Sequence, residues 1–321
     1  MKLELKMIEK FSQLSDKKRK WYSISLSVFT AIILTLLGIY VIEEYGVSMF
    51  IITPFFLGFT PIILYNYKNK FEKNISTELG YFSLTFFMLG LIIFAIEGLV
   101  CIAMALPIAI FITYLGTISA NFIIKKRSQQ GPTLMILLIF VIPGFSFIEH
   151  KTEPTIHKVI TTIDINASAD QVWNNVIEFP TLKKPTEFIF KAGIAYPINA
   201  TIKGKGVGAI RYCNFTTGSF VEPITKWEKN KLLAFDVLQQ PAPMKELSFW
   251  DIDAPHLHDY FVSQKGQFKL IKLSKKKTRL IGTTWYKNDI KPAFYWNLWS
   301  SNFIHQIHNR VLNHIKINAE K

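Results

Sequence analysis

The chain has 321 residues, of which 50% are apolar, with a mean hydropathy of +0.23 and a formal net charge of +14. This hydrophobicity excludes an ordinary soluble protein, and the length is sufficient for two domains. The two cysteines, Cys101 in an apolar run and Cys213 in a predicted strand, have such different settings that neither a disulfide nor a cysteine-based metal site is expected.

The hydrophobicity is unevenly distributed along the chain. Residues 21–147 hold almost all the long apolar runs, whereas residues 151–321 show the short alternating pattern of a folded aqueous domain. The first 150 residues carry 13 Lys and Arg against 9 Asp and Glu, and the remainder carries 24 against 14. A basic domain attached to a membrane is expected to attract anionic headgroups. No zinc-finger spacing or RNP-like strand indicates nucleic acid, so the expected partners are membrane lipids and no nucleic acid.

Residues 1–20 are predicted to form a cytoplasmic interfacial segment. Apolar residues spaced among lysines are typical of a short helix at the membrane surface. A simple basic leader that orients the first span is the alternative. A cleavable signal peptide is not expected, because the apolar block that follows is too long.

Five membrane spans are predicted in residues 21–148. The apolar run Gly80–Ile124 has 45 residues, and a single helix of that length would be about 68 Å long at about 1.5 Å per residue. Two spans joined by a turn at Glu97 and Gly98 fit better, because a charge at the centre of a bilayer costs at least about 2.5 kcal/mol. The expected spans are approximately 21–42, 47–66, 80–97, 100–124 and 132–148.

The charges of the connecting segments predict the orientation of these spans. Lysines and arginines precede the first span and follow the second and fourth, whereas the segments with Glu43, Glu44 and Glu97 have none. The positive-inside rule then places the N-terminus in the cytoplasm. The prediction is a multi-pass protein of the inner (cytoplasmic) membrane whose C-terminal domain is periplasmic. The spans lack rows of ionisable residues, which favours an anchor or scaffold role.

Beyond a linker at residues 149–157, the pattern predicts a strand, a helix, further strands and a long final helix. Ile160, Ile163 and Ile165 mark the first strand, and Ser168 with Gln171 forms a capping-box pattern ahead of a helix that carries Trp173. The following strands are expected at 200–203, 209–215, 219–227, 232–238, 266–273 and 278–286, and the final helix at about 292–317.

This order resembles the START-like or SRPBCC superfamily, which includes polyketide cyclase/dehydrase-like and lipid-transfer proteins. The resemblance covers about residues 156–318, with the domain itself placed at 158–318. It implies an α+β helix-grip fold, with a curved antiparallel sheet around the long C-terminal helix. It also implies a hydrophobic cavity between the sheet and that helix. The expected fold class is therefore a membrane α-helical bundle of five spans followed by a helix-grip domain.

Polar and aromatic residues of this domain are candidates for lining the pocket. Arg211 and Glu222 lie on adjacent predicted strands and could pair there, either to hold a polar headgroup or as an ordinary ion pair. The histidines suggest a zinc site, a polar role at the pocket mouth or plain structure. Because no acidic residue completes a metal spacing, no metal and no cofactor are expected. The candidates are Arg211, Glu222, Glu246, His256, His258, Thr284, Trp285, Tyr286, Trp296, His305 and His308.

Two segments between the strands have alternative interpretations. Residues 239–261 form a long loop with three prolines, which suggests a lid or binding loop, or a loop that buries its own aromatic residues. The glycine-rich stretch 204–208 leads into a strand and not a helix, so it is interpreted as a hairpin turn and not a phosphate-binding loop.

The leading hypothesis is a membrane-anchored domain, without enzymatic activity, that binds a hydrophobic small-molecule ligand and possibly transfers a lipid. A cyclase, dehydratase or hydrolase that uses Glu222, Glu246 or the late histidines in the cavity is one alternative. A sensory or assembly protein whose domain binds another protein is the other. The sequence makes no prediction of the oligomeric state.

Overall fold

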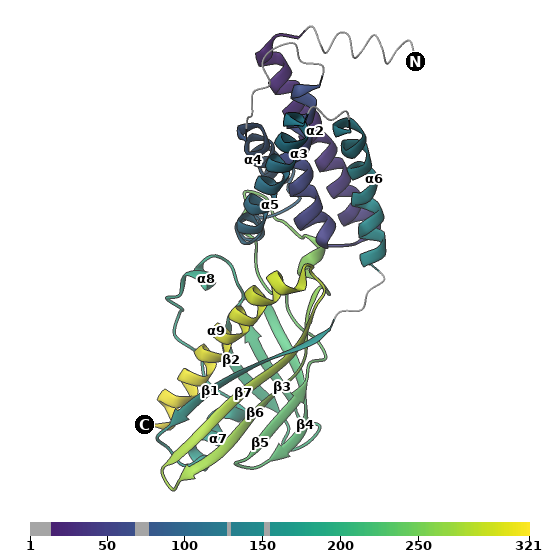
Figure 1. Cartoon of the computed structure of the whole chain (residues 1–321). Coiled ribbons are helices and arrows are strands. Elements are labelled where there is room, and N and C mark those ends of the chain that lie inside the picture. Colours follow the sequence, from purple (N-terminus) through teal and green to yellow (C-terminus); the bar gives the residue numbers. More distant parts are fainter. Residues whose placement is uncertain (1–13, 68–76, 127–129, 151–154) are drawn as a thin grey trace. The chain divides into compact units, whose positions relative to one another are not determined.

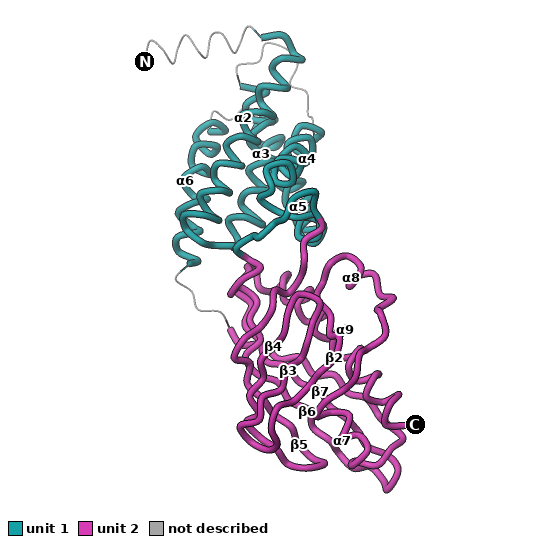
Figure 2. Tube along the Cα trace, turned by 180° about the vertical axis from the view of Figure 1, so that it is seen from behind, with its two compact units in different colours: residues 1–152, 248–255 teal, residues 153–247, 256–321 magenta. Residues whose placement is uncertain are grey.

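The computed structural model describes residues 14–67, 77–126, 130–150 and 155–321. The chain forms two compact units, residues 1–152 with 248–255 and residues 153–247 with 256–321 (Figure 2). The predicted interfacial helix of residues 1–20 and the basic segment at 68–73 lie largely or wholly outside the described residues.

The first unit is a bundle of apolar helices (Figure 1). Two of these helices contain short π-helical segments, next to the connection between the first two predicted spans. The elements are α2 (Asp16–Leu37), η1 (Gly38–Ile42), η2 (Ser48–Ile52), α3 (Thr53–Asn66), α4 (Glu78–Ile93), α5 (Leu99–Lys125) and α6 (Gly131–Glu149).

Four helices of the described part of the chain are long and apolar enough to cross a membrane, so the prediction of five full-length spans is wrong in its count. These four are Asp16–Ile42, Ser48–Asn66, Leu99–Lys125 and Gly131–Glu149. The expected third span is α4, which has 16 residues and is therefore about 24 Å long, against a hydrocarbon core of about 30 Å. The turn predicted at Glu97 is confirmed, because α4 ends at Ile93 and α5 begins at Leu99.

Small residues allow α3 and α5 to approach closely. A Cβ on Gly58 would lie 2.1 Å from the carbonyl oxygen of Thr113, and one on Gly116 would lie 2.4 Å from that of Phe55. The Thr113 hydroxyl also donates a hydrogen bond to the Pro54 carbonyl at 3.1 Å. Close backbone contact of this kind favours helix association where apolar burial supplies little driving force.

Polar contacts join particular helix ends of the bundle. Arg19 at the start of α2 donates to the carbonyls of Tyr65 and Tyr67 at the end of α3. Near the other ends of these two helices, the Glu149 carboxylate accepts from the backbone N–H of Val47 at 3.1 Å and of Ser48 at 3.4 Å. The α2–α3 connection and the end of α6 therefore lie together.

The second unit contains a seven-stranded antiparallel sheet that curls around a long helix, as the resemblance implies. The strand order is β1-β7-β6-β5-β4-β3-β2, and Figure 1 shows the final helix crossing the concave side. The strands are β1 (Ile156–Ile165), β2 (Pro197–Lys203), β3 (Ile210–Phe215), β4 (Gly218–Glu228), β5 (Leu232–Asp236), β6 (Phe261–Ser274) and β7 (Lys277–Asn288). The helices are α7 (Ala169–Ile177), α8 (Phe188–Lys191), the 3₁₀ helix η3 (Pro255–Leu257) and α9 (Ala293–Ala319).

Local signals explain why these elements begin and end where they do. The capping box is present, because the Ser168 side chain caps α7 while Gln171 reaches back to the Ser168 backbone. Gly204, Gly206 and Gly208 all have positive φ, which glycine adopts without strain, and they form the predicted turn between β2 and β3.

Two differences from the predicted elements have identifiable causes. Strand β6 begins at Phe261 and not at residue 266, because a bulge between Ser263 and Lys265 interrupts the alternation of inward and outward side chains. The short helix α8 was not predicted, since one helical turn leaves no periodic pattern.

Candidate functional site

A buried ion pair lies on the inner face of the sheet. Arg211 of β3 and Glu222 of β4 are directly opposite each other in the antiparallel register, and their side chains form a salt bridge. The two residues are 1% and 6% exposed. The Arg211 Nε also donates to the Ile177 carbonyl at the end of α7, at 3.2 Å. The guanidinium is thus fixed between a carboxylate and a helix end.

Three aromatic rings surround the guanidinium of Arg211. Its central carbon lies 5.6 Å from the ring centroid of Phe179, 5.5 Å from that of Phe235 and 5.6 Å from that of Phe268. These distances are in the range of cation–π attraction, which strengthens when the cation is removed from water. None of the three phenylalanines was predicted as a site residue, because they come from segments far apart in the chain.

Burial shifts the ionisation of groups beside this pair. It raises the pKa of Glu222, an effect that the charge of Arg211 partly offsets. Burial also raises the pKa of the neighbouring Cys213 thiol to about 12, so this thiol is a poor nucleophile at neutral pH.

A second cluster of polar side chains joins α9 to the edge strand β1 and to its neighbour β7. The Thr161 hydroxyl lies 2.8 Å from His305 Nδ1 and 2.9 Å from His308 Nδ1, and the Thr284 hydroxyl lies 2.8 Å from His308 Nε2. Burial, followed by the charge of His305, lowers the pKa of His308 to about 4. His308 is therefore neutral at pH 7, with both ring nitrogens held by hydroxyl groups.

The polar contacts continue toward the start of α9. The Tyr286 hydroxyl lies 3.1 Å from Ser301 Oγ, and the Asn288 amide donates to Asn297 at 3.1 Å and to Ser300 at 3.3 Å. The later part of α9 packs instead through apolar residues, which are Val311, Leu312, Ile315 and Ala319. The first half of the helix thus meets the sheet largely through polar contacts, together with the buried Ile304, and the second half through apolar residues.

The remaining candidate residues lie elsewhere in the second unit. Trp285 is on the outer face of β7, beneath the Lys265 ammonium at 5.1 Å from the ring centroid, and so does not face Arg211. Trp296 is buried on α9. Glu246 lies in the loop after β5, His256 in η3, and His258 just beyond it.

The concave side expected to enclose a cavity is occupied by an apolar core. It is formed by α7, α9 and the inner faces of the strands, with the rings of Trp173 and Trp227 in an edge-to-face contact at 5.6 Å. The core includes Trp173, Val176, Phe179, Leu182, Leu233, Phe235 and Phe268. The Arg211–Glu222 pair is therefore embedded among packed side chains.

No family model and no curated protein matches the chain. Solved structures match its C-terminal half. A protein from Nitrosospira multiformis is 14% identical with a TM-score of 0.33, covering 51% of this chain and 96% of that chain. Norcoclaurine synthase from Thalictrum flavum, in complex with dopamine and hydroxybenzaldehyde, is 13% identical with a TM-score of 0.32, covering 51% and 86%. An uncharacterised protein from Bacillus thuringiensis is 12% identical with a TM-score of 0.33, covering 51% and 100%. Similarity this low carries no information on ligand or activity.

Proposed function

We propose that this chain is a membrane protein whose second unit binds an amphipathic ligand, such as a lipid, on the concave side of the sheet. The apolar body of the ligand packs among the aromatic residues of the core, and its polar end is held by Arg211 and Glu222. The bundle of apolar helices keeps this unit at the membrane from which such a ligand comes.

The buried Arg211–Glu222 pair carries this proposal. Removing each of the two charges from water costs several kcal/mol, and their mutual attraction roughly offsets this cost. A buried ion pair is therefore weak evidence that the pair stabilises the fold. The ion pair is better explained as part of a ligand site, because binding sites combine apolar walls with a few polar groups in defined positions. The guanidinium can hold a carboxylate or phosphate of a ligand, and the carboxylate can accept from a hydroxyl.

Binding requires the core to open. Because packed side chains occupy the concave side, the ligand must displace apolar groups such as Phe179, which belongs to the irregular segment after α7. The apolar tail of a lipid replaces the contacts that these groups lose. Cys213, buried beside the pair, is a natural reporter of this opening.

The contacts of the candidate acid/base residues favour binding over catalysis. Glu222 pairs with Arg211, whereas His305 and His308 are hydrogen-bonded to threonine hydroxyls of β1 and β7. General acid–base chemistry requires its groups within hydrogen-bond reach of one reacting centre. These residues instead form two separate groups of contacts.

Extraction of ligands from the purified full-length protein tests the proposal. Mass spectrometry of the wild-type protein should find a bound amphipathic molecule, and the double variant Arg211→Met with Glu222→Met should lose it while remaining folded. The matched control is Lys226→Met with Glu228→Met, which removes one charge of each sign from exposed positions of β4, the strand that carries Glu222. Wild-type protein free of ligand, or equal ligand in the wild type and the Arg211/Glu222 variant, would overturn it.

We further propose that α4 completes a fifth passage through the membrane, with the second unit outside the cytoplasm. The end of α6 and the α2–α3 connection lie together through Glu149, Val47 and Ser48. Between these two points the chain runs through α3, α4, α5 and α6, and an even number of passages is needed to return to the same end. A short helix is tolerated by local thinning of the bilayer.

A further inference from the structure

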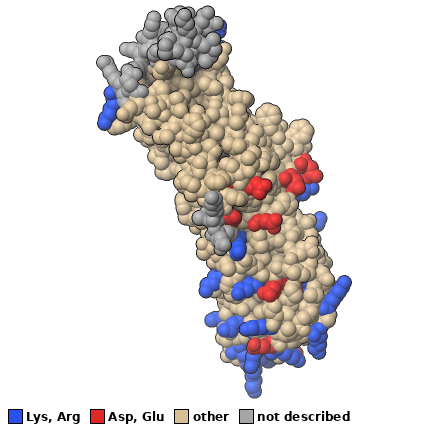
Figure 3. Space-filling model, turned by 90° about the vertical axis from the view of Figure 1, so that its right-hand side faces the viewer, with Lys and Arg blue, Asp and Glu red and all other residues tan. Residues whose placement is uncertain are grey.

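One end of the curled sheet in the second unit carries a concentration of positive charge. From Lys269 to Arg279, across the β6–β7 hairpin, the sequence has six Lys and Arg and no Asp or Glu. The β4–β5 turn beside it adds Lys229 and Lys231. Figure 3 shows basic side chains crowded at this end of the unit, with few acidic ones among them.

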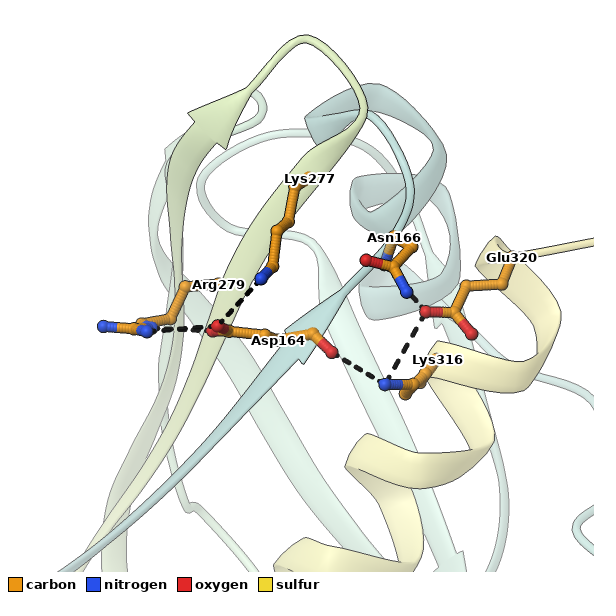
Figure 4. A network of polar contacts seen from close by, with 6 residues as sticks. All are labelled: Asp164, Asn166, Lys277, Arg279, Lys316 and Glu320. Carbon is orange, nitrogen blue, oxygen red and sulfur yellow. Dashed lines mark hydrogen bonds and ion pairs between the residues drawn. The ribbon is translucent and has the colours of Figure 1, made fainter.

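Some of these charges are neutralised by neighbours. The Asp164 carboxylate accepts from Arg279 at 2.7 and 3.1 Å and lies 3.6 Å from the Lys277 ammonium (Figure 4). Lys316 of α9 donates to the Asp164 carbonyl at 2.9 Å, which joins the base of the hairpin to β1 and to the end of α9. Lys229 pairs with Asp170 at 3.3 Å.

Five lysines are left without such compensation. Lys231, Lys269, Lys272, Lys275 and Lys276 are exposed, and no carboxylate of the described residues lies within ion-pair distance of them. The first four line an open hollow of about 910 Å³ between the β4–β5 turn, the hairpin and the first turn of α7, which Asp170 and Glu228 also line. Lysines outnumber carboxylates in this hollow, so the concave surface carries a net positive charge.

Exposed aliphatic side chains alternate with these lysines on the hairpin. Ile271 is 38% exposed and Leu273 is 43% exposed. Lysines attract the phosphates of an anionic bilayer, and aliphatic side chains enter the boundary between headgroups and acyl chains. A nucleic acid would use only the charges, since residues 269–279 offer no aromatic ring for base stacking. The combination favours a lipid surface.

The hairpin lies at the end of the sheet away from the point where the chain enters the second unit. The chain enters the second unit at Ile156, the residue of β1 opposite Lys287, and β1 reaches the hairpin end only at Ile165, opposite Thr278. These ten residues span about 30 Å of extended chain. The connection to the first unit therefore leaves from the end of the sheet opposite the hairpin.

We propose that the hairpin surface, formed by Lys231, Lys269, Ile271, Lys272, Leu273 and Lys275, docks on an anionic phospholipid bilayer. This inference is independent of the ligand site, because the hairpin surface is on the outside of the unit and shares no residue with it.

Vesicle capture tests the inference with the full-length protein. The protein is reconstituted in phosphatidylcholine vesicles and mixed with fluorescent acceptor vesicles, either of phosphatidylcholine alone or containing phosphatidylglycerol. Flotation then measures the acceptor vesicles captured per protein molecule whose C-terminus is accessible from outside. Capture should require phosphatidylglycerol in the acceptor vesicles and should decline as salt is added.

A matched pair of variants separates this surface from net charge. Changing Lys231, Lys269, Lys272 and Lys275 to Gln should weaken capture about tenfold or more, because each lysine near an anionic surface contributes substantially to binding. Changing the exposed lysines 183, 184, 191 and 245 to Gln alters net charge equally and should preserve capture. Ile271→Ser with Leu273→Ser retains every lysine and should weaken capture severalfold. Thermal unfolding and ligand content, measured for each variant, show whether its fold and ligand site are intact.

Several outcomes would overturn the inference. Equal capture of neutral acceptor vesicles, or equal capture by the two lysine variants, would remove the role of this surface. Capture of duplex DNA without capture of vesicles would indicate a nucleic acid partner.

Discussion

Arg211 and Glu222 illustrate how single residues can be costly to the fold and useful to a site. Each charge is stabilised mainly by the other, and apart from the Ile177 carbonyl and the Cys213 thiol the surroundings are aromatic and aliphatic groups. Loss of one partner leaves an uncompensated buried charge, whereas loss of both leaves an apolar space. The stability of variants at these positions should therefore be strongly non-additive.

We expect Arg211→Met or Glu222→Met alone to reduce the free energy of unfolding of the second unit by about 3 to 5 kcal/mol. The double variant should recover most of this loss, because it buries no unpaired charge. Urea unfolding followed by tryptophan fluorescence measures all three variants in a double-mutant cycle. Additive losses in the double variant would contradict this account of the pair.

His308 should make the second unit sensitive to acid. Its folded-state pKa of about 4 is below the ordinary value of 6.5, so the unfolded chain binds the proton first as the pH falls. The stabilising contribution of neutral His308 is present above pH 6.5 and is lost progressively toward pH 4, by up to about 3 kcal/mol.

Urea unfolding at several pH values measures this loss. His308→Gln retains a side chain that can bond the two hydroxyls but does not titrate, so its stability should decline less between pH 6.5 and 4. His258→Gln makes the same substitution at an exposed histidine and serves as the control. Identical pH profiles for wild type and His308→Gln would show that this residue is not the source.

At the scale of elements, the crossing of α3 and α5 depends on the absence of side chains. A Cβ on Gly116 would lie 2.4 Å from the Phe55 carbonyl oxygen and 3.1 Å from the Phe59 nitrogen, so the helices must separate to accept it. Gly144 in α6 has no neighbouring atom within 4 Å of its Cβ position.

Gly116→Ala should therefore lower the stability of the detergent-solubilised protein by about 1 to 3 kcal/mol, as overpacking does elsewhere. Gly144→Ala is the matched control and should be neutral or slightly stabilising, because alanine is the better helix former. Thermal unfolding monitored by circular dichroism compares them. Equal effects of the two substitutions would mean that α3 and α5 do not depend on this close contact.

At the scale of the whole molecule, the number of membrane passages determines the compartment of the second unit. Five passages place it opposite the N-terminus, and four place it on the same side. The polar contacts at the two ends of the bundle favour five, because the end of α6 lies with the α2–α3 connection.

Reporter fusions after Lys126 and after Lys321 test the number of passages. With five, the fusion after Lys126 should be active only as a cytoplasmic reporter, and the fusion after Lys321 only as an exported one. With four passages, in which α4 does not cross, the fusion after Lys126 should be exported and the fusion after Lys321 cytoplasmic, and this result would refute the proposed orientation.

Local sequence patterns predicted much of the fold, because each depends on near neighbours in the chain. Period-two alternation located the strands, apolar runs located the helices of the bundle, and Ser168 with Gln171 marked the start of α7. The turn at Glu97 followed from the cost of burying a charge in a bilayer. The end of α4 at Ile93 could not be predicted from the sequence, because an apolar run does not show where its helix is interrupted.

The sequence by itself thus determined the order and type of the main strands and helices of the second unit, the two-part organisation of the pattern and the placement of Arg211 and Glu222 on adjacent strands. Only the tertiary structure decided that these two residues are directly opposite, that Phe179, Phe235 and Phe268 surround them, and that side chains fill the concave face. The physical reason is that register and burial depend on neighbours supplied by distant segments. The same holds for the hairpin surface, whose unpaired lysines could be recognised only once Asp164 and Asp170 had been placed beside other partners.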